Sequence, residues 1–161
     1  MNQLTTYSQL RVRVQLVRDL PKKYLPKVEL STAEDVFNFL KDEVSLWDRE
    51  KFVSIMLTSR NMVIAIEEVG VGSLTATIIH PREVFKSAIL ANASAVILVH
   101  NHPSADPTPS LEDKQMTEKL KSSADILSFN MLDHIIIAAG GYSSWAEGWA
   151  SHTALSDPLS F

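Results

Sequence analysis

The chain has 161 residues, 45% of them hydrophobic and 21% charged, which is the composition of an ordinary globular protein with enough chain for one well-packed domain. Its net charge of −4 argues against a generally basic nucleic-acid-binding surface, and its lack of cysteine excludes disulfides, thiolate metal sites and cysteine nucleophiles. No apolar run reaches the roughly 20 residues that span a bilayer and no signal-peptide core is present, so we expect a cytoplasmic protein.

The N-terminal part is predicted to contain a strand, an extended connection and a helix. Residues 7–17 alternate apolar and polar side chains, which is typical of a strand, and two prolines favour an extended connection over residues 20–30. Ser31 and Glu34 have the spacing of a capping box, and the apolar stripe that follows predicts a helix over residues 31–44. Six basic residues here are interpreted as solvated surface charges: Arg11, Arg13, Arg18, Lys22, Lys23 and Lys27.

The rest of the chain alternates between strand and helix patterns. Strands are expected at 50–57, 62–70, 73–79, 94–100, 133–141 and 142–147, with helices at 80–93 and 110–127. Residues 58–61, Thr-Ser-Arg-Asn, can turn a hairpin, and Pro81 suits the first turn of a helix. In the later helix, the residues expected to face inward are Met116, Leu120 and Ile126 or Leu127. This order predicts an α/β fold, a mixed β-sheet flanked by helices.

Two histidines close the predicted strand at 94–100, and an acidic residue follows at the start of the next helix. Side chains two residues apart on a strand point to the same side, so the rings of His100 and His102 face one point. A loop stiffened by prolines then leads to Asp113 in the first helical turn. Two imidazoles and one carboxylate are a three-ligand set for zinc that leaves a fourth position for water. The alternative is that Ser110 and Asp113 form a helix cap and the histidines are ordinary polar loop residues.

The pattern His-x-His-x7-Ser-x2-Asp resembles the JAMM signature of the JAB/MPN metallopeptidases. The longer stretches HPREVFKSAILANASAVILVHNHPSADPTPSLED and LDHIIIAAGGYSSWAE resemble the RadC-like branch of that family, over roughly residues 45 to 150. The resemblance implies the JAB/MPN metallopeptidase fold, which is cytidine-deaminase-like. It also implies one Zn²⁺ per chain, bound by His100, His102 and Asp113.

The same resemblance implies two catalytic residues. Ser110 matches the motif serine, which hydrogen-bonds the developing oxyanion or the substrate carbonyl. The family also needs an upstream glutamate as general acid and base, usually where the first strand of the core begins, and Glu50 occupies that place. Glu67 and Glu68 are rivals, but they follow the hairpin turn, where the family pattern does not put this residue.

Two further features bear on the site. The Asp133–His134 pair is common in the family and implies a role in the fold or in supporting the ligands, rather than in binding the metal. Ala105 departs from the family pattern, which has glycine at this position. If the loop needs a positive φ here, alanine strains it.

We expect three parts in the chain: residues 1–45, a strand, connection and helix packed on the core; a RadC-like JAB/MPN domain over residues 46–152; and a C-terminal tail over residues 153–161. Full-length RadC proteins usually carry an N-terminal helix-hairpin-helix region that implies DNA contact. Residues 1–45 are too short for such a region, which weakens the expectation of a DNA-repair role.

These features predict a zinc-dependent hydrolase, a metallopeptidase that cleaves an amide or isopeptide bond in a protein or peptide substrate through a metal-activated water. The alternative is a non-catalytic adaptor in DNA repair or recombination, whose binding would survive loss of the ligands. Hydrolysis of a nucleic-acid phosphodiester fits less well, because two-metal clamps need more carboxylates. Nucleic-acid binding is not indicated by the charge, and the substrate and the oligomeric state stay open.

Overall fold

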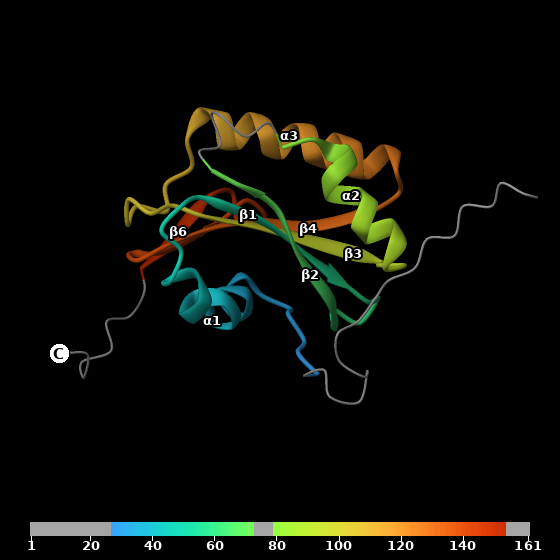
Figure 1. Cartoon of the computed structure of the whole chain (residues 1–161), viewed down its shortest axis with the longest axis horizontal. Coiled ribbons are helices and arrows are strands. Elements are labelled where there is room, and N and C mark those ends of the chain that lie inside the picture. The colour runs from blue at the N-terminus through green and yellow to red at the C-terminus, as the bar shows by residue number, and fades with distance from the viewer. Residues whose placement is uncertain (1–26, 73–78, 154–161) are drawn as a thin grey trace, which may run out of the picture.

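The computed structural model describes residues 27–72 and 79–153, which form a six-stranded sheet with helices on both faces (Figure 1). The strand predicted at 7–17 lies outside these residues, as does nearly all of the one predicted at 73–79. In the described ranges no helix is both long and apolar enough to cross a membrane. The elements in chain order are α1 (Ala33–Val44), β1 (Lys51–Leu57), β2 (Val63–Val71), α2 (Pro81–Leu90), β3 (Ala95–Asn101), α3 (Leu111–Ile126), β4 (Asn130–Ala138), β5 (Gly141–Ser144) and β6 (Ala150–Thr153).

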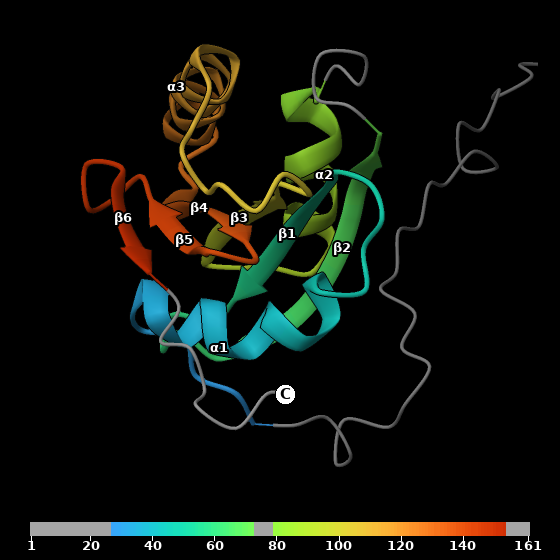
Figure 2. The same ribbon diagram turned by 90° about the vertical axis from the view of Figure 1, so that its left-hand side faces the viewer.

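The sheet is mixed, with the strand order β2-β1-β3-β4-β5-β6. Its central pair, β3 and β4, is parallel, and the other neighbours are antiparallel. Parallel neighbours need a long connection, and α3 supplies it between β3 and β4. Figures 1 and 2 show α1 on one face of the sheet and α2 and α3 on the other. The predicted α/β fold with a mixed sheet flanked by helices is confirmed.

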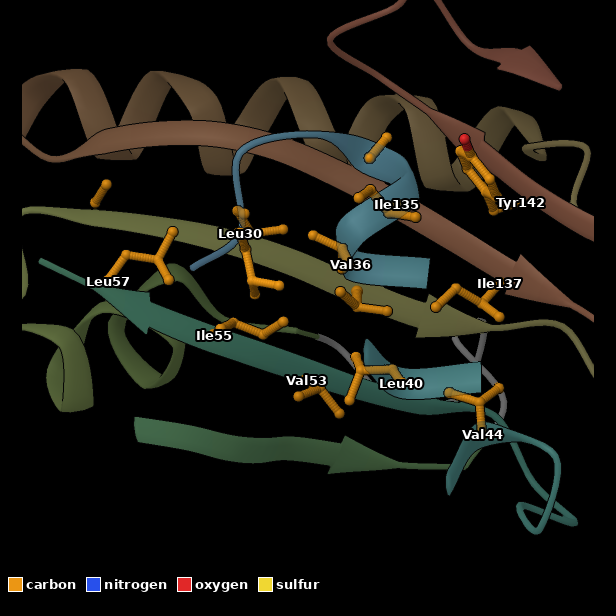
Figure 3. Close-up of a cluster of buried hydrophobic side chains, with 14 residues drawn as sticks. Leu30, Val36, Leu40, Val44, Val53, Ile55, Leu57, Ile135, Ile137 and Tyr142 are labelled. Carbon is orange, nitrogen blue, oxygen red and sulfur yellow. The ribbon is translucent and has the colours of Figure 1, made fainter. Parts of the chain in front are cut away.

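Each face of the sheet has its own hydrophobic core. Val36 and Leu40 of α1 are buried against the sheet beside Ile55 of β1 (Figure 3). Phe52, also on β1, belongs instead to the cluster under α2 and α3. Because neighbouring strand residues point to opposite faces, β1 supplies side chains to both cores. The face under α2 and α3 also holds His100, directly opposite Phe52 in the β1–β3 pair.

The helix starts agree with the sequence except for the cap of α1. Its N-cap is Thr32, not Ser31, and the capping box is completed by Asp35, not Glu34. The Asp35 carboxylate accepts hydrogen bonds from the backbone N–H groups of Thr32 at 2.9 Å and Ser31 at 3.0 Å. Both pairs have the same three-residue spacing, so the sequence pattern alone did not separate them. Pro81 begins α2 as predicted.

The inward face of α3 is polar near its start, which the sequence pattern missed. Its buried residues are Asp113, Thr117, Leu120 and Ala124, which lie on one side of the helix. The prediction for Leu120 is confirmed, and Met116 is half-buried beside it. The prediction for Ile126 or Leu127 is wrong, since they are 84% and 45% exposed. Ile126 lies on the opposite side of the helix from Asp113, and Leu127 is the C-cap, where the helix ends.

The strands follow the prediction with differences at the ends. β1 and β2 form the expected hairpin, in which Asn61 takes φ +54°. β5 ends at Ser144, earlier than predicted, because a turn follows it. β6 was not predicted, and its four mostly exposed residues carry no apolar alternation that could have signalled it.

Candidate metal centre

The candidate site forms where β3 ends against the first turn of α3. His100 is the penultimate residue of β3, a strand that is buried along its whole length. His102 follows the strand, and its backbone N–H donates to the carbonyl of Ile137 on β4 at 2.9 Å, so the chain keeps its strand direction. Asp113 lies in the first turn of α3. The structure thus brings together the three side chains predicted as ligands, in a cluster that could hold a metal ion.

The spacing of the three side chains suits a small cation. His100 Nε2 lies 3.1 Å from His102 Nε2 and 3.3 Å from Asp113 Oδ1. His102 Nε2 lies 3.5 Å from Asp113 Oδ2. Ligand atoms bound tetrahedrally at zinc distances are about 3.3 Å apart. The nearest Asp113 oxygen differs for the two rings, and the separations are close to that value, so a small cation fits between the three side chains.

The two carboxylate oxygens of Asp113 have different surroundings. Oδ2 accepts hydrogen bonds from the backbone N–H of Ser110 at 2.8 Å and from its hydroxyl at 2.7 Å. Oδ1 is buried and has no hydrogen-bond partner among the described residues. Burying a carboxylate oxygen without a partner is costly unless a cation neutralises it. This unpaired oxygen, facing His100, fits a metal-ligand atom.

The helix cap that the alternative predicted is present, and it does not exclude metal binding. The backbone N–H of Asp113 donates to the Ser110 hydroxyl at 3.1 Å, which completes a capping box with Ser110 as the N-cap of α3. The hydrogen bonds that begin the helix therefore also orient the carboxylate. Burial favours a raised pKa for Asp113, but the His100 and His102 rings, which stabilise the ionised carboxylate when they are protonated, outweigh it and hold the pKa well below its usual range.

The ring of His102 is oriented by the loop that follows it. Its Nδ1 lies 2.9 Å from the backbone carbonyl of Asp106, which can only accept, so Nδ1 carries the hydrogen and Nε2 is left bare. Burial pulls the pKa of His102 down, but the Asp113 carboxylate and the Asp106 carbonyl, which both stabilise the protonated ring, raise it above its ordinary value. The bare Nε2 is the atom that faces the cluster.

Glu50 lies beside this cluster. In the β1–β3 pair Phe52 is opposite His100, so continuing the same register by two residues places Glu50 opposite His102. Burial lowers the pKa of His100, and the negative charges of Asp113 and Glu50 oppose that shift. The contribution of Glu50 indicates that its carboxylate lies near the His100 ring. Glu50 is half-buried, just before β1 begins.

Asn101 is a site residue that sequence reasoning missed. Its side-chain amide bridges to both backbone neighbours of Glu50: it accepts from the N–H of Lys51 at 2.7 Å and donates to the carbonyl of Arg49 at 3.0 Å. This clamp fixes the chain at Glu50 against the end of β3. An asparagine between two candidate ligands was the available signal, but its partners are 50 residues away and no local pattern reveals them.

The rival glutamates lie elsewhere. Glu67 lies on β2, opposite Ser54 of β1. Because β1 separates β2 from β3, the Glu67 backbone is about 10 Å from β3 across the sheet. Glu68 forms an ion pair with Lys51 at 2.7 Å. Among the described residues, neither glutamate forms a hydrogen bond or ion pair with the three clustered side chains. The geometry favours Glu50 over both.

Of the Asp133–His134 pair on β4, His134 contacts the site and Asp133 braces the fold. Asp133 accepts hydrogen bonds from the Ser144 hydroxyl at 2.6 Å and the Ala146 N–H at 2.9 Å, which tie β4 to the turn after β5. Burial raises the pKa of Asp133. His134 is fully buried behind His100, and its Nε2 lies 2.9 Å from His100 Nδ1, on the side of that ring away from the cluster.

The backbone of the loop between the histidines and α3 is strained at Ala105, where the family pattern has glycine. Ala105 takes φ +65°, a left-handed conformation that costs an alanine roughly 1–2 kcal/mol. Its carbonyl accepts a hydrogen bond from Gly140 at 3.1 Å, and a Cβ on Gly140 would meet that oxygen at 2.6 Å. The loop therefore approaches the β4–β5 turn so closely that glycine is required there.

Replacing Ala105 with glycine is expected to stabilise the protein. The relief of strain exceeds the extra freedom that glycine gains in the unfolded chain, so the net gain is about 0.5–1 kcal/mol. Urea unfolding should show a higher midpoint with an unchanged slope. Gly140→Ala, the matched control, should lower the midpoint, and a lower midpoint for Ala105→Gly would show that this φ is not strained.

Comparison with known proteins gives the family. A family model described as RadC-like JAB domain matches residues 30–150. A UPF0758 protein of Caldanaerobacter subterraneus subsp. tengcongensis is 50% identical over 121 residues, which cover 74% of this chain and 52% of that protein. UPF0758 proteins of Symbiobacterium thermophilum and Moorella thermoacetica are 46% and 42% identical over 123 and 144 residues, covering 76% and 89% of this chain and 53% and 63% of theirs. The chain thus spans about half the length of the first two relatives. It belongs to the RadC-like JAB domain family.

Proposed function

We propose that the protein is a zinc-dependent hydrolase that cleaves an amide or isopeptide bond in a protein or peptide substrate. The observation that carries this proposal is the convergence of His100, His102 and the unpaired Oδ1 of Asp113 on one point, with Glu50 alongside. Membership of the RadC-like JAB family supports it. Three protein ligands are the set of catalytic zinc sites, which keep one position open.

The donor set favours zinc or another transition metal over magnesium and calcium. Imidazole nitrogens suit zinc and other transition metals, whereas magnesium and calcium prefer sites made of oxygen. Separations of 3.1–3.5 Å among the ring nitrogens and carboxylate oxygens are compatible with ligand atoms at zinc distances. When bound, zinc supplies a Lewis acid that acidifies water and polarises a carbonyl group.

Glu50 would carry the proton. It accepts a proton from the attacking water as the water oxygen bonds to the carbonyl carbon, and it returns that proton to the amide nitrogen as the carbon–nitrogen bond breaks. Its place just before β1, two residues from Phe52 opposite His100, and its charge effect on both histidines support a carboxylate near the cluster.

Ser110 would act in two ways. Its hydroxyl hydrogen is directed at Asp113 Oδ2, so Ser110 orients the ligand. Oδ2 also has the backbone N–H of Ser110 as a donor, so the hydroxyl can turn to a substrate carbonyl oxygen without leaving Oδ2 unpaired. Ser110 is exposed, which such a contact requires.

A groove on the α1 face of the sheet, which meets the site at His102, is the proposed path for the substrate chain. It has a volume of about 430 Å³, lies beside the C-terminal end of α1, and reaches His102. Aromatic, apolar and charged groups share its lining, which includes Phe37, Lys41, Trp47, Asn101 and Pro103. A mixed lining of this kind suits a polypeptide, which presents apolar side chains beside polar backbone groups.

The proposal predicts metal-dependent cleavage of amide bonds. Zinc-loaded protein, incubated with a library of quenched fluorescent peptides and isopeptide-linked lysine peptides, should release fluorescence from at least one class. Removing the metal with a chelator should stop the reaction, and added zinc should restore it. Cleavage that continues after complete metal removal, or no cleavage of any member by zinc-loaded protein, would contradict the proposal.

A further inference from the structure

A chain of buried hydrogen bonds runs from the backbone carbonyl of Asp113 through Thr117 and His134 to His100. Which group donates at each step follows from the Asp113 end. The Thr117 hydroxyl lies 2.6 Å from the backbone carbonyl of Asp113, which can only accept, so the hydroxyl donates there. The same oxygen lies 2.7 Å from Nδ1 of His134. The hydroxyl has no second hydrogen, so Nδ1 of His134 must donate to it.

The position of the hydrogen on His134 in turn determines the position of the hydrogen on His100. His134 is fully buried, and among the residues that the structure describes its two ring nitrogens form hydrogen bonds with the Thr117 hydroxyl and His100, neither of which is an acid. A neutral ring that carries its hydrogen on Nδ1 has a bare Nε2. That Nε2 lies 2.9 Å from His100 Nδ1, so His100 must donate from Nδ1. The Nε2 of His100 is then bare, and it is the atom 3.3 Å from Asp113 Oδ1.

We propose that Thr117 and His134 are positioning residues that set the tautomer of His100 and so keep its Nε2 available to bind a metal. The inference rests on the proposed metal site and adds residues that touch neither metal nor substrate. The chain begins at the carbonyl of Asp113 and ends at the ring beside the Asp113 carboxylate, so it links two of the three ligands. His102 is prepared separately, by the Asp106 carbonyl.

Thr117 offers a matched pair of variants. Thr117→Val keeps the shape but removes the hydroxyl, so Nδ1 of His134 faces a methyl group. The His134 ring is then more stable with its hydrogen on Nε2, from which it donates to Nδ1 of His100. The hydrogen of His100 therefore moves to its Nε2, the atom that should bind the metal. Thr117→Ser keeps the hydroxyl and should preserve the wild-type arrangement. Loss of such supporting partners typically weakens metal affinity by roughly 10- to 100-fold.

The test combines imidazole NMR with zinc affinity. In metal-free wild-type protein, long-range ¹H–¹⁵N spectra should show His100 and His134 both protonated on Nδ1. In Thr117→Val both should change to the Nε2 form, while His102 should stay as it is and show that the fold is intact. Competition with a zinc-binding dye should give about 10- to 100-fold weaker affinity for Thr117→Val and near wild-type affinity for Thr117→Ser.

Two results would overturn the inference: a wild-type spectrum with His134 protonated on Nε2, or a folded Thr117→Val that binds zinc as tightly as wild type. If Thr117→Val does not fold, the wild-type spectrum decides. Because that spectrum needs no metal, it also separates this inference from the proposed function. A wild-type protein that binds no zinc refutes the hydrolase, whereas the tautomers are observed in either case.

Discussion

Glu50→Gln is expected to lower the turnover of zinc-loaded protein by roughly 10²- to 10⁴-fold, the usual contribution of a positioned general acid and base. Glutamine has the size and hydrogen-bonding reach of glutamate but cannot take up the proton of the attacking water. The zinc content should stay at the wild-type level, because Glu50 is not one of the three clustered ligands. The measurements are kcat on a cleaved peptide and elemental analysis of the same sample.

Glu67→Gln and Glu68→Gln are the matched controls for this experiment. Both rivals lie on β2, and Glu68 is held by Lys51. Each control variant should therefore keep kcat close to wild type. Full activity in Glu50→Gln would remove Glu50 from the proposed role, and loss of activity in Glu67→Gln instead would transfer the role to that residue. Thermal unfolding of each variant separates lost chemistry from lost fold, which matters for Glu67 because one of its carboxylate oxygens is buried.

What the sequence predicted well was local. The capping pattern at Ser110, the helix start at Pro81 and the hairpin before Val63 each depend on residues within a few positions of one another. The proximity of His100, His102 and Asp113 was expected from the resemblance to the JAMM signature, and the structure brings these side chains together, whereas their role as metal ligands stays a prediction.

What the sequence did not predict depends on contacts across the chain. Asn101 binds the backbone about 50 residues earlier, and Thr117 meets His134, 17 residues later, only because β3 and β4 are parallel neighbours. Thr117 also explains the error in α3. An inward-facing threonine looks like a break in the apolar stripe, although it is the polar part of a buried hydrogen-bond chain. The division of the chain into residues 1–45 and 46–152 stays a prediction. Helix α1 packs in the same core as the strands.

Purified wild-type protein is expected to contain about one zinc per chain, and His102→Ala is expected to lose nearly all of it after dialysis. His102 is the best ligand to remove. The His102 side chain is 13% exposed, whereas that of His100 is fully buried against its neighbours. Alanine at His102 therefore disturbs packing less than alanine at His100 would. His152→Ala is the matched control, because His152 pairs with Glu147 and stacks on Tyr142, away from the cluster.

Zinc should also stabilise the folded protein in a way that reports the same site. A metal present at 100 times its dissociation constant adds about 2.7 kcal/mol to the free energy of unfolding. For a domain of this size, that gain raises Tm by roughly 5–10 °C. Wild type and His152→Ala should both show the rise, and His102→Ala should not. No zinc in the wild type would overturn the hydrolase proposal. Full zinc in His102→Ala, with an undiminished Tm response, would show that the metal binds somewhere other than between His100, His102 and Asp113.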